Sequence, residues 1–171
     1  KSHSKISFEK KTINKLIALL PEHALYFQQL HPRYQNWLPF YWKGFQQTTR
    51  YTYIIDLKQS LDRIWDQFKG NIRRNIRKAE SSGFTCTEIQ DFEAFWSALR
   101  QSYQNRGKVI PFQESHLRSI EEVCSKNKAR KMFVTQNAEG NLLAGIYLVF
   151  DEKSSYYLVG FFDPAYKDYA A

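Results

Sequence analysis

Apolar residues in the second two-thirds of the chain follow two spacings, and each spacing predicts one kind of element. Apolar side chains three or four positions apart indicate amphipathic helices, whereas short runs rich in β-branched and aromatic residues indicate strands. The predicted helices lie at 60–68, within 70–84, at 91–107 and at 114–127. The predicted strands lie at 84–89, 131–136, 142–150 and 154–162.

This order of elements predicts an α/β (α+β) fold. From residue 84 the chain runs strand, two helices and three strands, and DPAYKDYAA begins a further helix with Pro164 near its first turn. NAEGN and DEKS separate the last three strands, which suits tight hairpins. We therefore expect a mixed sheet with flanking helices, in which 131–162 forms an antiparallel meander in the middle of the sheet.

The first part of the chain has a different pattern. KTINKLIALL at 11–20 has helical spacing, and the polar residues before it predict a frayed start. Strand composition appears at 24–30 and again at 46–57, on either side of a loop that contains five aromatic residues. Strand composition gives way to helical spacing near 57–60, which predicts a boundary between residues 1–57 and 58–171.

One helix has an unusual surface. In GNIRRNIRKAESSGF, Ile72, Ile76 and Ala79 share one face, with Asn71 as the expected N-cap and Gly83 as the expected stop. Four basic residues occupy the rest of the surface: Arg73, Arg74, Arg77 and Lys78. Like charges four positions apart repel, so this pattern suits an anion-binding site as well as a solvated helix face.

The distribution of charge favours an anionic partner. The chain carries a net charge of +8, and residues 1–83 hold 15 Lys/Arg against 6 Asp/Glu, so the excess lies in that half. A local excess of this kind suits nucleic acid, a phosphorylated substrate or a membrane surface.

Several classes of protein lack sequence support. Cys86 and Cys124 form neither a disulfide framework nor a zinc motif, the four histidines show no ligand spacing, and a reducing cytoplasm is the expected setting. No serine-hydrolase, Walker or dinucleotide motif is present, and no apolar run is long enough to span a membrane. The first residue is not Met, so we expect a fragment of a longer chain.

The order and spacing of the motifs resemble a known family. A strand ending in Asp, a helix, a basic helix and a strand resemble the second domain of the FemAB-type transferases, tandem GNAT-fold bacterial proteins that include peptidoglycan aminoacyltransferases. The matching residues are Asp56, Arg73, Arg77, Lys78, Ala79 and Gly83. FWSALRQSYQNRGKVIPF and the run from 142 to 171 resemble the family's later helix, turn and central strands, so the likeness covers roughly 24–171.

The resemblance implies a fold, an activity and candidate residues. Residues 1–57 would end a first GNAT-like domain, and 58–171 would begin a second one with a GNAT-like mixed sheet. The activity would be N-acyl transfer, in which an amine attacks an acyl or aminoacyl carbonyl. Arg106 matches an acceptor-binding arginine, and Tyr157 could hydrogen-bond the substrate from its strand. Their structural alternatives are a helix-terminal cation and a core tyrosine.

The acyl donor is left open between aminoacyl-tRNA and acyl-CoA, and we expect neither a tightly bound cofactor nor a metal. GNAT enzymes that use acyl-CoA hold its pyrophosphate on a glycine-containing loop, whereas YKDYAA has no glycine and carries Asp168. The resemblance implies tRNA or a nucleotide-linked cell-wall precursor as anionic partner.

Two rival functions are an RNA-binding module and a catalytically inactive GNAT-like interaction domain. The aromatic loop with Trp37, Tyr41, Trp42 and Lys43 suits either stacking on a base or sugar, or packing between two domains. No residue is identified as the general base.

Overall fold

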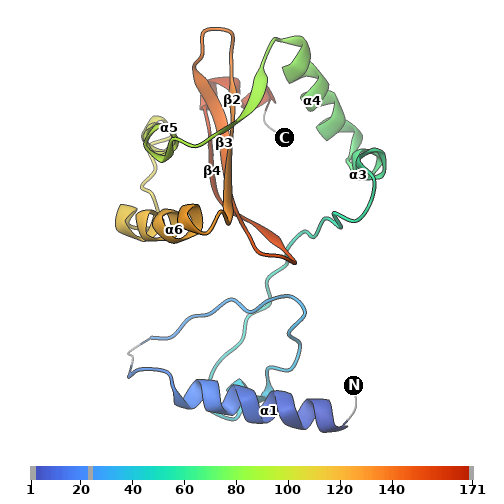
Figure 1. Cartoon of the computed structure of the whole chain (residues 1–171), viewed down its shortest axis with the longest axis vertical. Coiled ribbons are helices and arrows are strands. Elements are labelled where there is room, and N and C mark those ends of the chain that lie inside the picture. The colour runs from blue at the N-terminus through green and yellow to red at the C-terminus, as the bar shows by residue number, and fades with distance from the viewer. Residues whose placement is uncertain (1–2, 23–24, 170–171) are drawn as a thin grey trace. The chain divides into compact units, whose positions relative to one another are not determined.

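A computed structural model describes residues 3–22 and 25–169, and the side chains up to residue 166 (Figure 1). The chain forms two compact units, Lys1–Lys58 and Gln59–Ala171, which are described separately.

The described residues of the first unit contain two helices, α1 (His3–Ala18) and α2 (Leu38–Tyr41). Helix α1 includes residues that were expected to fray, so that prediction is wrong from His3 onward. Part of the aromatic loop forms α2, where Pro39 occupies the first turn, a position that needs no backbone N–H. The Trp37 and Tyr41 rings meet edge to face at 5.4 Å, and the Lys10 ammonium lies 4.3 Å from the Trp42 ring.

The strands predicted at 24–30 and 46–57 are wrong for the residues that the structure describes. Residue 24 lies outside them, and 25–30 and 46–57 have no strand pairing. Tyr51 and Tyr53 are almost fully exposed. A strand is stabilised by the hydrogen bonds and side chains of its neighbours, so composition alone does not make one.

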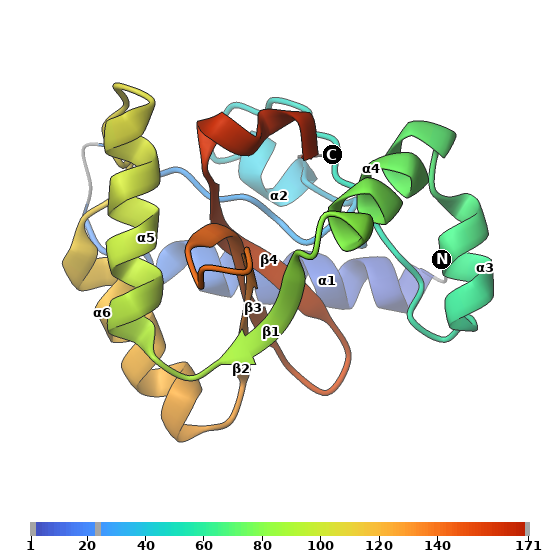
Figure 2. The ribbon, with the colours of Figure 1, turned by 90° about the horizontal axis from the view of Figure 1, so that it is seen from above.

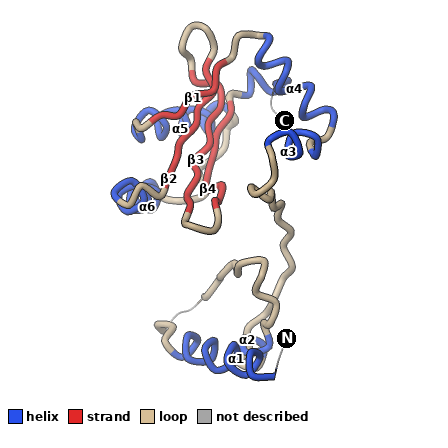
Figure 3. Tube along the Cα trace, turned by 45° about the vertical axis from the view of Figure 1, so that its right-hand side comes forward, coloured by secondary structure: helices blue, strands red, loops and turns tan. Residues whose placement is uncertain are grey.

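The second unit is built on a four-stranded antiparallel sheet in the order β1-β2-β3-β4. Its strands are β1 (Thr85–Ile89), β2 (Arg130–Gln136), β3 (Leu142–Phe150) and β4 (Ser155–Phe162). The predicted fold class and meander are therefore confirmed, and Figure 3 shows the strands side by side. The prediction that all three meander strands lie in the middle of the sheet is wrong for β4. Among the described residues, β4 pairs only with β3 and lies at the edge.

Over residues 59–169, four α-helices and a short 3-10 helix accompany the sheet: α3 (Leu61–Gln67), α4 (Gly70–Ser81), α5 (Phe92–Asn105), α6 (Glu114–Lys126) and η1 (Pro164–Tyr169). Figures 1 and 2 show α5 and α6 on one side of the sheet and α3 and α4 on the other. Helix α3 forms where helical spacing predicts it, but it buries no side chain, and Leu61 is 83% exposed.

The core lies between the sheet and helices α5 and α6. Strand alternation points Met132, Tyr147 and Val159 to the same face, where the register sets them side by side. Phe95 of α5 has no exposed surface, and its ring meets the Tyr147 and Phe161 rings edge to face at 5.8 and 5.2 Å. This contact fixes α5 across β3 and β4.

Gly145 allows one of these aromatic rings to lie on the sheet. A Cβ atom at position 145 would lie 2.4 Å from Cε1 of Phe161 on the neighbouring strand, which is closer than such atoms can approach. The absence of a side chain therefore makes room for the Phe161 ring above β3.

The helix ends set the positions of the candidate residues. The Ser60 and Asp91 side chains accept hydrogen bonds from the amides of Arg63 and Ala94, as expected of N-caps. The predicted cap at Asn71 is wrong, because α4 begins at Gly70 with Lys69 as its N-cap. Gly83 has a φ of +77° and ends α4 as predicted, with Phe84 N–H donating to the Ala79 carbonyl.

Candidate functional site

Arg106 is fixed at the C-terminal end of α5. Its Nε donates to the Ser102 carbonyl at 3.0 Å. Its Cζ lies 4.7 Å from the Tyr103 ring centroid and 4.8 Å from that of Phe162. The guanidinium is therefore held by two aromatic rings as well as by the helix terminus, where a cation is favourable.

Ser102 joins the end of α5 to the end of β4. It is 4% exposed, and its hydroxyl donates to the Phe162 carbonyl at 2.6 Å. Sequence reasoning missed Ser102, Tyr103 and Phe162. Ser102 and Tyr103 precede Arg106 by four and three positions, a helical spacing that could have indicated them.

Tyr157 lies in the same neighbourhood, on β4. Partial burial and the nearby Tyr103 hydroxyl raise its pKa above the usual value, while the Arg106 charge partly opposes this shift. The phenol therefore stays protonated at neutral pH and can donate a hydrogen bond. Two predicted site residues, Arg106 and Tyr157, therefore influence each other electrostatically.

A β-bulge shapes β4 at this point. Tyr147 pairs with Val159 and Leu148 pairs with Tyr157, so Leu158 is the extra, unpaired residue of the bulge. Tyr156 and Tyr157 are 45% and 64% exposed, so the alternative of a core tyrosine is wrong for Tyr157. Tyr156 and Tyr157 pair regularly with Val149 and Leu148 and still alternate, but the first four residues of β4 are all exposed.

The four basic residues of α4 form a separate group, which we call the basic face (Arg73, Arg74, Arg77 and Lys78). Arg73 pairs with Asp66 of α3 at 3.5 Å, and the Arg77 guanidinium lies 5.6 Å from the Trp65 ring. Arg74, Arg77 and Lys78 are exposed. Two of the four side chains therefore also link α4 to α3.

The start of η1 is already capped by a carboxylate. Asp163 Oδ1 accepts the Ala165 amide at 2.9 Å, and the Asp163 carbonyl accepts the Tyr166 amide at 3.0 Å. The side chain of Asp168 lies outside the described residues. A negative charge at this terminus opposes binding of phosphate there.

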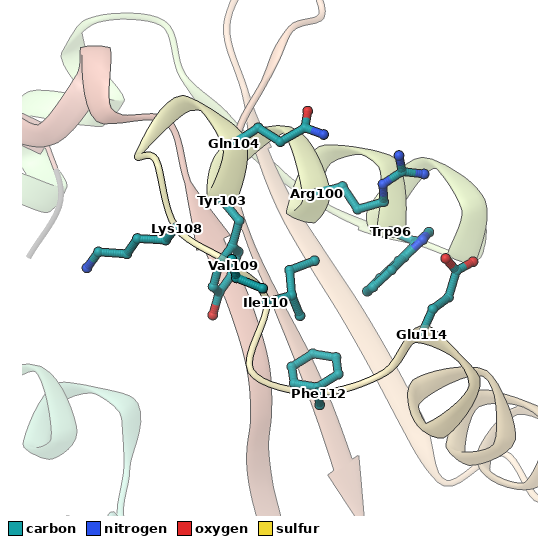
Figure 4. Close-up of a pocket in the computed structure, with 9 residues that line it drawn as sticks. All are labelled: Trp96, Arg100, Tyr103, Gln104, Lys108, Val109, Ile110, Phe112 and Glu114. Atoms are coloured by element: carbon teal, nitrogen blue, oxygen red, sulfur yellow. The ribbon is translucent and has the colours of Figure 1, made fainter.

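A cavity of about 360 Å³ opens between α5 and the segment that leads to α6 (Figure 4). Its lining comes from one face of α5 and from residues 108–114: Trp96, Arg100, Tyr103, Gln104, Lys108, Val109, Ile110, Phe112 and Glu114. Tyr103 thus contributes both to this cavity and to the surroundings of Arg106. Over the described ranges, no group of three or more His, Cys, Asp or Glu side chains could hold a metal ion.

The sheet, the helices that cover it and the Arg106 region all lie in a part of the chain that matches a known domain. The family model described as "Acetyltransferase (GNAT) domain" matches residues 66–171, more than half of the chain. The chain belongs to the GNAT acetyltransferase family. The GNAT domain begins within α3 and includes all four strands and the candidate residues on α4, α5 and β4.

Membership of the GNAT family confirms the GNAT part of the resemblance and supports acyl transfer in general. GNAT acetyltransferases typically take acyl-CoA as the donor substrate and an amine as the acceptor. No curated protein matches the chain. None of the described helices is long and apolar enough to cross a membrane.

Proposed function

We propose that this GNAT domain belongs to an N-acyltransferase of the FemAB-type group. The observation that carries the proposal is the position of Arg106 at the junction of α5 and β4 within a GNAT fold, where its charge also acts on the Tyr157 phenol. Arg106 is held by Ser102, Tyr103 and Phe162 before any substrate arrives, and such preorganisation lowers the cost of ordering the site.

Each residue has a role that suits its geometry. The Arg106 Nε is used by the Ser102 carbonyl, which leaves its two terminal nitrogens to bind an anionic group of the acceptor. Tyr157 keeps its proton and would donate a hydrogen bond to a substrate carbonyl. We assign neither residue as a general base.

In the proposed reaction, the acceptor amine attacks the acyl carbonyl, and the new N–C bond replaces the bond to the leaving group. The leaving group is the ribose hydroxyl if aminoacyl-tRNA is the donor, or a thiol if acyl-CoA is the donor. The amine loses one proton to solvent and the leaving group gains one. Positioning of the amine and polarisation of the carbonyl would supply the catalysis.

Aminoacyl-tRNA is the favoured donor. Asp163 occupies the start of η1, and that segment has no glycine to bring the backbone close to a pyrophosphate. The exposed basic residues of α4 can instead contact tRNA phosphates. This donor suits a cytoplasmic reaction, and the resemblance to bacterial FemAB-type proteins makes a nucleotide-linked cell-wall precursor a candidate acceptor.

The proposal also includes the domain organisation expected from the family resemblance. Residues 1–57 would be the end of a first GNAT-like domain and 58–171 the first part of a second. The division of the chain into compact units after Lys58 is compatible with this assignment.

A transfer assay tests the proposal. The protein is incubated with tRNA charged with radiolabelled amino acids and with UDP-linked cell-wall peptides, and label in the peptide is measured. Arg106→Lys keeps the charge but loses the planar fork, so we expect kcat/KM to fall about tenfold to hundredfold. Lys153→Gln, in the exposed turn between β3 and β4, is the matched control and should leave transfer unchanged.

Transfer that requires an acyl-CoA in place of tRNA would overturn the proposed donor. Equal kcat/KM for the parent protein and Arg106→Lys would overturn the role of Arg106.

The basic face of α4 supports one alternative, an RNA-binding module without chemistry. Its exposed cations would bind phosphates independently of sequence. Strong RNA binding with no transfer under any donor would favour this module. Absence of both would favour an inactive interaction domain.

A further inference from the structure

The cavity beside α5 contains a buried hydrogen-bond donor that lacks a partner. Trp96 is 5% exposed, and its indole Nε1 makes no hydrogen bond in the structure. Buried tryptophan N–H groups usually have a partner, because an unpaired buried donor costs about 1–3 kcal/mol. Trp96 lines the cavity, so a ligand seated there can supply the missing acceptor.

A cation lies beside this donor. Figure 4 shows the Trp96 nitrogen on the side of the cavity where the Arg100 guanidinium and the Glu114 carboxylate also lie. No ion pair involves Arg100 within 3–22 or 25–169, whereas Glu114 is already bound by Arg118 at 2.6 Å. The positive charge of Arg100 is therefore available to an anion.

Apart from Gln104 and Lys108, the remaining walls are aliphatic or aromatic. Ile110 and Phe112 lie between Tyr103 and Trp96 in Figure 4, and the Trp96 and Phe112 ring centroids are 6.5 Å apart. A volume of about 360 Å³ is within the usual range for small-molecule sites. These walls suit a hydrocarbon or aromatic body and disfavour a strongly hydrated dianion.

We infer that this cavity binds a small organic carboxylate with an apolar body. One carboxylate oxygen accepts the Trp96 N–H, and the other accepts from the Arg100 guanidinium on the same side of the cavity. The apolar body lies against Ile110 and Phe112. The inference stands apart from the proposed acyl transfer, because neither Trp96 nor Arg100 has a role in that proposal.

The test is a titration of the 171-residue chain followed by proton–nitrogen NMR. The chain has four tryptophans, and the indole N–H signal of Trp96 is the readout. With 3-phenylpropanoate we expect a saturable downfield shift of that signal below about 10 mM, which corresponds to weak binding. The matched neutral probe, 3-phenylpropan-1-ol, should leave the signal in place.

Variants separate the ligand site from general effects of charge. Arg100→Gln removes an exposed cation without touching the core, and we expect affinity for 3-phenylpropanoate to fall at least about tenfold. Lys126→Gln, at the exposed end of α6, removes the same charge and should keep the parent affinity. The inference is wrong if the Trp96 signal does not move, if the alcohol or inorganic phosphate moves it equally, or if Arg100→Gln binds like the parent.

Discussion

At the scale of single residues, Glu121 links two side chains of the sheet to α6. Its carboxylate accepts from the Arg130 guanidinium at 2.8 Å and from the Tyr147 hydroxyl at 2.5 Å. The Arg130 side chain is only 7% exposed, and Gln90 accepts a further hydrogen bond from it at 2.7 Å. A buried arginine of this kind depends on its carboxylate partner.

Removal of that carboxylate should destabilise the second unit. We expect Glu121→Ala to lower the free energy of unfolding by about 3–5 kcal/mol, because Arg130 and Tyr147 would then be buried without their shared acceptor. Urea denaturation measures the effect. Glu122→Ala changes an exposed neighbour on the same helix and should stay within about 0.5 kcal/mol of the parent. A loss below about 1 kcal/mol for Glu121→Ala would contradict this account.

The burial of Tyr147 and its hydrogen bond to Glu121 also determine how its contribution to the stability of the fold changes with pH. Burial, and next the Glu121 carboxylate, raise the pKa of Tyr147 above its usual value of 10.0. Ionisation of this phenol is thus easier in the unfolded chain than in the folded one. Its contribution to stability is complete below pH 10 and falls as the pH rises further.

At the scale of elements, α4 combines two uses of its basic residues. Arg73 and Arg77 contact α3 through Asp66 and Trp65, while the exposed face is available to an anionic polymer. Phe84, just after α4, meets Tyr166 of η1 edge to face at 5.7 Å. The basic helix is therefore anchored at both ends.

Binding of RNA should depend on the exposed part of α4. We expect Arg74→Ala with Arg77→Ala to weaken binding of bulk tRNA and to reduce the slope of log K against log salt by about 1 to 2, one for each lost phosphate contact. Fluorescence anisotropy at several salt concentrations measures both. Lys126→Ala with Lys153→Ala removes the same charge elsewhere and is the control. Equal losses in both double variants would indicate a general charge effect instead of a site on α4.

Elements were predictable from sequence where local signals agreed. The meander, α5 with its Asp91 cap, and the Gly83 stop each combine periodicity with turn or capping chemistry. The segment 46–57 has the composition of a strand, but it pairs with no other strand among the described residues. Strand pairing depends on neighbours that are distant in the sequence, so composition alone does not predict it.

The site was predictable only in part for a related reason. Arg106 and Tyr157 were identified one at a time, but the contact of Arg106 with Phe162 depends on α5 lying across β4. Phe162 and the β-bulge at Leu158 became visible only with the strand register.

At the scale of the whole molecule, family and local chemistry favour different donors. The GNAT domain brings an expectation of acyl-CoA, whereas η1 has a carboxylate at its start and no glycine. These local features are repulsive or sterically restrictive toward a diphosphate.

Acetyl-CoA should therefore bind poorly. We expect a dissociation constant of about 1 mM or weaker, near −4 kcal/mol, by calorimetry on the whole protein. An Asp163→Asn variant removes the charge at the start of η1 and should bind acetyl-CoA more tightly than the parent. Micromolar binding by the parent would refute the argument about the donor while strengthening the assignment to acyl transfer.

The contact between Gly145 and Phe161 has a consequence for the history of this sequence. Because the ring occupies the space of the missing side chain, the two positions cannot vary independently. A relative that acquires alanine at 145 should carry a smaller residue at 161, and one that keeps phenylalanine should keep glycine. Gly70 meets no such restriction, since a Cβ there would have no atom within 4 Å. Simultaneous substitutions at positions 145 and 161 would thus identify related proteins that keep this sheet but pack α5 on it differently.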